Sequence, residues 1–258
     1  MQTSTARSES TFHAGARRRT WLKSAGVSLT TAIGVTALQA CGGANAADDR
    51  SCDRDRGFPA FFDQAPTLTM RDPFAQFLGA ASDGVIRYAY ADAVRMAGHS
   101  CPAVAGTYLM TLRGLRALYG AELPERGGID VAMRDAADSG VTGVYASVLQ
   151  LLTGAAPQTG YPGMGPGKRF SRQDLLTYGA QMDGVFAMRR RDSGRTVQLR
   201  IDHDTVPATE EMKALMPKAI ANTASAAELQ RFAQLWQERV RKMLIEHADD
   251  PKLIQLIE

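Results

Sequence analysis

Apolar and polar residues recur at two spacings along the chain, and each spacing predicts one kind of element. From residue 102 to residue 119, apolar side chains return every three or four positions. This pattern predicts a helix that starts at Pro102 and ends at Gly120. Residues 185–190 and 196–201 have a β-type pattern and are joined by Asp192-Ser193-Gly194, which predicts a hairpin.

Shorter patterns predict further helices at residues 73–78, 91–97, 144–152 and 209–216, and further strands at residues 85–90 and 129–133. Ser225 and Glu228 form a capping box that opens a long C-terminal helix. The apolar face of that helix, interpreted as core packing, consists of Leu229, Phe232, Trp236, Val240 and Met243. No internal repeat or second linker interrupts residues 69–258, so we predict a single domain of the α+β class.

The first 40 of the 258 residues have the features of an export signal. Arg17-Arg18-Arg19-Thr20-Trp21-Leu22-Lys23 resembles the twin-arginine motif. The apolar stretch that follows is too short and too weakly apolar to predict a membrane span. We therefore predict that residues 1–40 direct the folded protein through the twin-arginine route to the periplasm.

Two cleavage sites fit the residues after this signal. Leu38-Gln39-Ala40-Cys41 resembles a lipobox, which would make Cys41 a lipidated first residue and this lipid the only membrane attachment. Ala44-Asn45-Ala46 fits the rule of ordinary signal peptidase instead, and we favour the lipoprotein. Residues 41–68 are rich in Gly, Ala, Asp and Arg and are interpreted as a flexible tether.

The formal net charge of +3 comes from the predicted signal. Without residues 1–40, the chain keeps 25 of its 30 basic residues and 26 of its 27 acidic residues. The mature protein is then close to neutral, which argues against a nucleic-acid partner. Three cysteines are too few for a disulfide scaffold.

The segment Gly98-His99-Ser100-Cys101-Pro102 carries the strongest candidate chemistry. Because Pro102 suits the first turn of a helix, Cys101 is expected at the N-cap, where free N–H groups and the helix dipole favour a thiolate. An imidazole two residues away could share a metal ion with it, and this ligand pair suits zinc or another transition metal. Two ligands do not close a site. The alternatives are a loop histidine beside a partly buried cysteine, or a Cys52–Cys101 disulfide in an oxidising compartment.

The same segment resembles the signature of the FmdE family, named after a formylmethanofuran dehydrogenase operon protein. Residues 149–154 are similar to its apolar-Q-x-L-T-G helix end, Lys168 lies in a comparable Gly-rich segment, and residues 188–195 are similar to its R-x-T-G-K hairpin. The likeness covers about residues 91–202. It implies an α+β core with helices on one side of a mixed β-sheet, often a homodimer, and a metal ion bound by His99 and Cys101.

The chain departs from the family pattern in two places. Val144 and Ala155 occupy positions where family members often have cysteine, and no cysteine follows Cys101, so the C-terminal zinc finger of some members is missing. The family name does not imply formylmethanofuran chemistry here, because that chemistry is cytoplasmic and belongs to large metal-cofactor subunits.

Three functions therefore remain. The leading hypothesis is an exported FmdE-like protein that holds a metal ion with His99 and Cys101 and handles a metal or cofactor for an extracytoplasmic redox protein. The first alternative is a redox or nucleophilic enzyme with Cys101 as its thiolate and His99 as its base. The second is a non-catalytic binding module with a Cys52–Cys101 disulfide.

Two further segments contain candidate ligand groups. His203 lies between Asp202 and Asp204 and could supply a third metal ligand, although a solvated strand end is the favoured interpretation. The Gly-rich residues 160–167 are followed by Lys168, Arg169 and, three residues on, Arg172, which could hold an anion. They do not match the P-loop pattern, and a plain surface loop is the favoured interpretation.

Overall fold

A five-stranded sheet organises the fold in this computed structural model, which describes residues 57–257. Its strands are β3 (Ile129–Met133), β4 (Leu176–Thr177), β5 (Phe186–Arg190), β6 (Thr196–Ile201) and β7 (Ile254–Ile257), in the spatial order β4-β3-β5-β6-β7. Strands β3 and β4 are parallel, and the other neighbours are antiparallel. The described residues contain both helices and a mixed sheet, which confirms the predicted α+β class.

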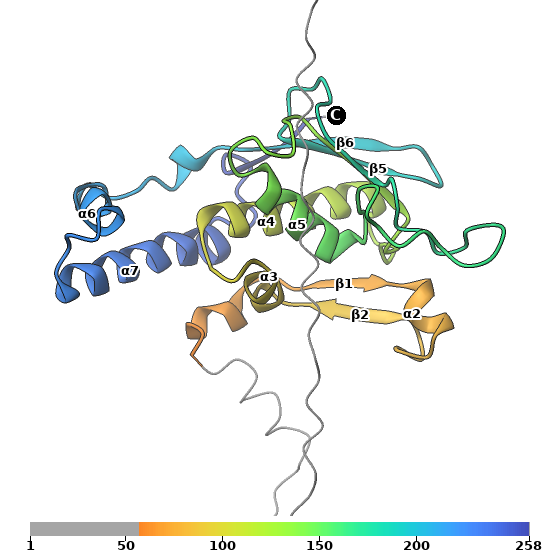
Figure 1. Ribbon diagram of the computed structural model, residues 1–258, viewed down its shortest axis with the longest axis horizontal. Coiled ribbons are helices and arrows are strands. Elements are labelled where there is room, and N and C mark those ends of the chain that lie inside the picture. Colours follow the sequence, from red (N-terminus) through yellow and green to blue (C-terminus); the bar gives the residue numbers. More distant parts are fainter. Residues whose placement is uncertain (1–56, 258) are drawn as a thin grey trace, which may run out of the picture. The chain divides into compact units, whose positions relative to one another are not determined.

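The helix α4 (Pro102–Tyr119) lies between this sheet and a second layer (Figure 1). Fourteen of its 18 residues are buried because it is covered on both sides. On the sheet side, Gly106 allows a close approach, since an added Cβ would lie 2.3 Å from Ile201 Cδ1. On the other side, the Tyr108 hydroxyl donates a hydrogen bond of 2.6 Å to the carbonyl of Pro66.

The second layer contains a β-hairpin and several short helices. They are η1 (Ala60–Gln64), β1 (Leu68–Arg71), α2 (Pro73–Phe77), β2 (Val85–Tyr88) and α3 (Tyr90–Ala97), and α5 (Thr142–Thr153) packs beside α4. Strands β1 and β2 are antiparallel. The Asp72 carboxylate caps α2, because it accepts hydrogen bonds from the N–H groups of Phe74 and Ala75.

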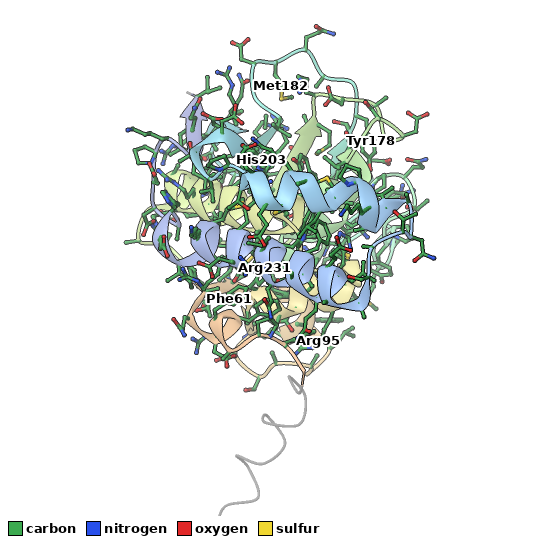
Figure 2. All side chains as sticks on the ribbon, turned by 90° about the vertical axis from the view of Figure 1, so that its left-hand side faces the viewer. Phe61, Arg95, Tyr178, Met182, His203 and Arg231 are labelled. Atoms are coloured by element: carbon green, nitrogen blue, oxygen red, sulfur yellow. The ribbon has the colours of Figure 1, made fainter. Side chains whose placement is uncertain are left out.

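The C-terminal part begins after β6 and ends in β7. It contains η2 (His203–Thr205), α6 (Glu210–Ile220), α7 (Ala226–Arg241) and the single π-helical turn η3 (Lys242–Glu246). Helices α6 and α7 pack side by side at one end of the layers (Figures 1 and 2). The Arg239 side chain of α7 donates to the carbonyls of Val206 and His203, which joins this helix pair to the end of β6.

Most predicted elements are confirmed within one to four residues, but two interpretations are wrong in part. The predicted tether of residues 41–68 is too long, since Phe62 is buried against Tyr90 with their rings 4.9 Å apart. The apolar face of the C-terminal helix is core only at its end. Val240 and Met243 are fully buried, whereas Leu229 is 40% exposed, because only the end of α7 and the following turn η3 reach the layers.

The predicted export signal, the cleavage sites with Cys41, and Cys52 lie outside the described residues. Within residues 57–257, no helix combines the length and apolar character that a membrane crossing requires.

Candidate functional site

The loop between α3 and α4 places Cys101 at the N-terminus of the central helix. Helix α3 ends at Gly98, whose φ of 75° is the left-handed conformation that glycine tolerates. Cys101 is the N-cap of α4, and Pro102 occupies the first helical position, as predicted. The Cys101 Sγ atom accepts a hydrogen bond of 3.5 Å from the Val104 N–H. The thiol is free and half-buried, so it combines access with a position that stabilises negative charge.

His99 lies two residues earlier in the same loop and is exposed. Its Nδ1 atom is 2.9 Å from the carbonyl oxygen of Ala97. Because a carbonyl oxygen only accepts hydrogen bonds, this contact places the proton on Nδ1 and leaves the lone pair on Nε2. A histidine that ligates a metal through one ring nitrogen usually donates the other N–H in this manner.

Ser100 fixes the loop between these two residues. Its hydroxyl is 2.9 Å from the Tyr90 hydroxyl, and its carbonyl accepts hydrogen bonds of 3.1 Å from both Trp236 Nε1 and Gln237 Nε2 of α7. The loop is therefore held by a helix that lies more than 130 residues later in the chain. Sequence analysis missed this role of Trp236, because its apolar periodicity gives no sign of the indole N–H bond.

Two buried phenols lie close to the thiol. Burial raises the pKa of Tyr90, and the charge of Cys101 raises it further, against the opposing effect of the hydrogen bond with Ser100. Burial and then the same Cys101 charge also raise the pKa of Tyr145. Both hydroxyls therefore remain protonated at neutral pH.

The described residues do not bring a third acidic, histidine or cysteine ligand to His99 and Cys101. Among residues 57–257, no three such side chains cluster in a way that could hold a metal ion. His203 is half-buried rather than solvated, and its Cε1 lies 3.7 Å from the position of a Cβ on Gly106 (Figure 2). Its Nδ1 is buried and has no hydrogen-bond partner within the described part. Burial, followed by the charge of Arg239, lowers the pKa of His203, so its ring is neutral at pH 7.

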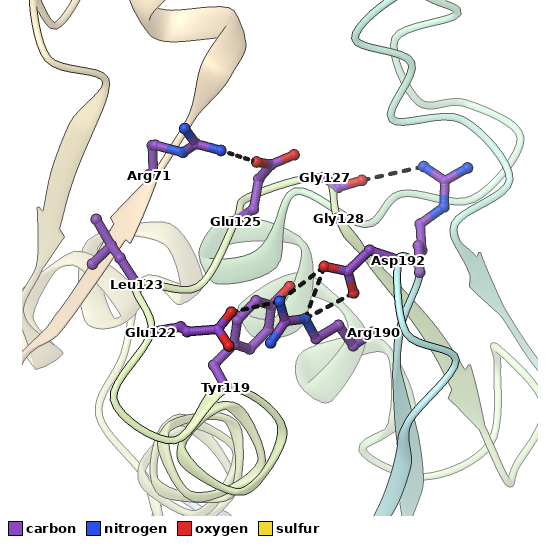
Figure 3. Close-up of a pocket in the computed structure, with 10 residues that line it drawn as sticks. Arg71, Tyr119, Glu122, Leu123, Glu125, Gly127, Gly128, Arg190 and Asp192 are labelled. Atoms are coloured by element: carbon purple, nitrogen blue, oxygen red, sulfur yellow. Dashed lines mark hydrogen bonds and ion pairs between the residues drawn. The ribbon is translucent and has the colours of Figure 1, made fainter.

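The other predicted candidates, Lys168, Arg169 and Arg172, lie together at a different place. Lys168 and Arg169 are exposed, whereas Arg172 is 8% exposed and donates to Asp72 at 2.7 Å. A cavity of about 470 Å³ is lined by these three residues together with other cationic side chains. It adjoins a cavity of about 570 Å³ near the end of α4 (Figure 3).

No protein-family model matches the chain, and no curated protein is significantly similar to it in sequence. The likeness to the FmdE family therefore rests on the motif residues alone, and the assignment of His99 and Cys101 as metal ligands stays a prediction. Val144 lies in α5, and Ala155 lies two residues after its end. Ala155 is fully buried among apolar residues.

Proposed function

We propose that this protein is an exported FmdE-like metal-binding protein that delivers a metal ion or metal cofactor to an extracytoplasmic redox protein. His99 and Cys101 would hold the ion. The observation that carries this proposal is the hydrogen bond between His99 Nδ1 and the Ala97 carbonyl, beside a thiol at a helix N-cap. Together they would supply one nitrogen donor, His99 Nε2, and one sulfur donor, Cys101 Sγ.

An incomplete ligand set suits delivery better than storage. Structural zinc sites are closed by four protein ligands, whereas open sites keep exchangeable positions. No third His, Cys, Asp or Glu side chain of the described residues completes such a group, so His99 and Cys101 would supply only two donors. The remaining positions are then available to water, to a second copy of the chain, or to the receiving protein, and a softer donor set on that protein would draw the ion away.

Metal analysis of the natively exported protein tests this proposal. We expect about one zinc or related transition-metal ion per site in the wild type, and at least a tenfold loss in His99→Ala and in Cys101→Ala. His247→Ala is the matched control, because His247 pairs with Asp250 at 2.8 Å far along the chain. If all four proteins are equally metal-free under metal-replete conditions, the proposal is wrong.

A thiol enzyme is the second candidate, and the free Cys101 thiol at the N-cap of α4 favours it, because the N–H groups of a helix N-terminus stabilise a thiolate. In that case His99 acts as the base, and Cys101 reacts rapidly with an alkylating agent in metal-free protein. The two candidates differ in one readout. Adding Zn²⁺ suppresses alkylation of a metal-binding Cys101 and leaves that of a purely nucleophilic Cys101 unchanged.

The alternative with a Cys52–Cys101 disulfide bond has a separate test. Cys101 is a free thiol in the structure, and Cys52 lies outside the described residues. Mass spectrometry of the exported protein before and after reduction distinguishes the cases, since a disulfide adds two hydrogens on reduction and two free thiols add none.

A further inference from the structure

The cavity beside α2 is distinguished by its charge. Six cationic side chains line it, namely Arg71, Arg126, Lys168, Arg169, Arg172 and Arg191, against one carboxylate, Glu125. Two further carboxylates touch the wall: Asp72 binds Arg126 and Arg172, and Asp130 lies 3.4 Å from Arg191. Six positive charges against these three negative charges still leave a net charge of about +3 around about 470 Å³. A concentration of like charge of this size attracts anions.

Two of the cations have no acidic partner among residues 57–257. No ion pair to Lys168 or Arg169 occurs in the described part of the chain, and both are exposed at the cavity. The Arg169 guanidinium instead stacks on aromatic rings, with its carbon 4.4 Å from the centroid of Phe170 and 5.2 Å from that of Phe77. Stacking fixes the plane of the guanidinium and leaves its in-plane N–H donors for a ligand.

Arg172 lines the cavity, and its guanidinium lacks one hydrogen-bond partner within the described part. It is more than nine-tenths buried, and one of its terminal nitrogens binds Asp72. Its Nε atom is buried and has no hydrogen-bond partner within the described part. Burying an unpaired guanidinium N–H is costly, so an acceptor supplied by a ligand would remove this cost.

The loop that carries these residues is held in one conformation by its own hydrogen bonds, without a ligand. Lys168 and Phe170 have φ values of 48° and 63°, which is the left-handed region that residues with a Cβ seldom adopt. Two backbone hydrogen bonds between Met164 and Arg169 and one from Arg172 to Tyr161 hold this geometry. Phe74 stacks against both Phe170 and Tyr161 and joins the loop to α2.

The adjoining cavity of about 570 Å³ has a different character. It shares Arg71, Glu125, Gly127 and Arg191 with the basic cavity. Its other charged groups are Arg190, Glu122 and Asp192, and Arg190 is paired with both acids (Figure 3). Leu123 and the Tyr119 ring complete its wall. This second cavity is near-neutral and partly apolar. It therefore suits the uncharged part of a molecule whose anionic group binds in the basic cavity.

We propose that the two cavities form one binding site for an organic phosphate, with its phosphate groups among Lys168, Arg169 and Arg172 and its organic body beside Tyr119 and Leu123. Guanidinium groups match the geometry of phosphate oxygens, and a net charge of about +3 suits a di- or triphosphate better than a single carboxylate. The site lies at the opposite end of α4 from Cys101. The 18 residues of that helix span about 27 Å, so this binding is independent of the metal proposal.

Calorimetric titration with pyrophosphate tests the basic half. We expect saturable binding that weakens as salt increases, and at least a tenfold loss of affinity in Lys168→Gln/Arg169→Gln. The matched control is Lys213→Gln/Lys218→Gln, which removes the same charge from α6 and should retain the affinity within twofold. If the double variant unfolds, Arg191→Gln replaces it, with a loss of about threefold. Equal losses in the test and control variants, equal affinity for citrate, or an adventitious ion only, with no saturation by pyrophosphate, would overturn the proposal.

Titration with ADP tests the neighbouring cavity. The added organic body should raise the affinity over that for pyrophosphate by at least fivefold. Leu123 is exposed, so Leu123→Asn should fold normally and, because it adds no charge, remove this gain while leaving pyrophosphate binding intact. An unchanged ratio of the two affinities in Leu123→Asn would show that the organic body does not occupy this cavity.

Discussion

Asp72 offers the sharpest test of how the two layers are held together. Its Oδ1 atom accepts from Arg172 at 2.7 Å and from the Phe74 N–H at 2.9 Å, and its Oδ2 atom accepts from Arg126 at 3.0 Å. The Asp72 side chain is 5% exposed, and that of Arg172 is 10% exposed. One carboxylate thus caps a helix and neutralises two guanidinium groups that belong to distant parts of the chain.

The substitution Asp72→Asn separates these two roles. Asparagine caps a helix about as well as aspartate, so α2 should keep its N-terminus. The buried charge of Arg172 would lose its partner, which typically costs about 3–5 kcal/mol of unfolding free energy. We expect about 3 kcal/mol, because Arg126 is partly exposed and can be solvated. Asp72→Ala also removes the cap and should cost about 1 kcal/mol more.

Urea denaturation of the mature protein measures these losses. Glu211→Gln is the matched control, since its pair with Arg231 is half-exposed on both sides and, screened by water, should contribute little. A loss below about 1 kcal/mol in Asp72→Asn would refute the reasoning, because the buried pair would then be no stronger than the exposed one.

The same carboxylate predicts a pH dependence. Burial acts to raise the pKa of Asp72, but the hydrogen bond from Arg126, the charge of Arg172 and two backbone N–H groups outweigh it and lower the pKa. A lowered folded-state pKa means that Asp72 contributes stability above its unfolded value of about 3.9, and that this contribution disappears as the pH falls through the folded value. The stability difference between wild type and Asp72→Asn should therefore be constant near pH 7 and shrink below about pH 4. A difference that does not change down to pH 2 would contradict this.

Two smaller substitutions test local contacts. Trp236→Phe removes one of the two hydrogen bonds to the Ser100 carbonyl, in the loop before Cys101. Alkylation of the thiol should then become about threefold faster, with about 1 kcal/mol of lost stability; an unchanged rate would argue against this contact. Gly127→Ala places a Cβ 1.3 Å from an Arg172 nitrogen at a φ of 87° and should cost about 3 kcal/mol of unfolding free energy. The control Gly165→Ala, at a φ of 66° in open space, should cost only about 1–2 kcal/mol. Equal losses of stability in chemical denaturation would contradict the close approach at Gly127.

Local signals predicted the elements well because their causes are local. Pro102 and Gly120 mark both ends of α4, and Asp192-Ser193-Gly194 marks the turn between β5 and β6. The N-cap position of Cys101 follows from Pro102 alone. These features depend on backbone restrictions of single residues, which the sequence displays directly.

Contacts between distant residues could not be predicted in the same way. Asp72 meets Arg126 and Arg172 across 54 and 100 positions, and no spacing rule relates them. The interpretation of the C-terminal helix as core failed for a similar reason. An apolar stripe indicates which face is buried but not how far along the helix its partner extends, and Leu229 lies beyond that partner.

X-ray absorption at the zinc edge of the natively exported protein tests the central claim most directly. The account predicts one sulfur neighbour at about 2.3 Å and at least one imidazole nitrogen at about 2.0–2.1 Å. It also predicts that the sulfur signal disappears in Cys101→Ser and the imidazole signal weakens in His99→Ala. A spectrum with only oxygen and nitrogen neighbours in the wild type, or one that neither substitution changes, would contradict it.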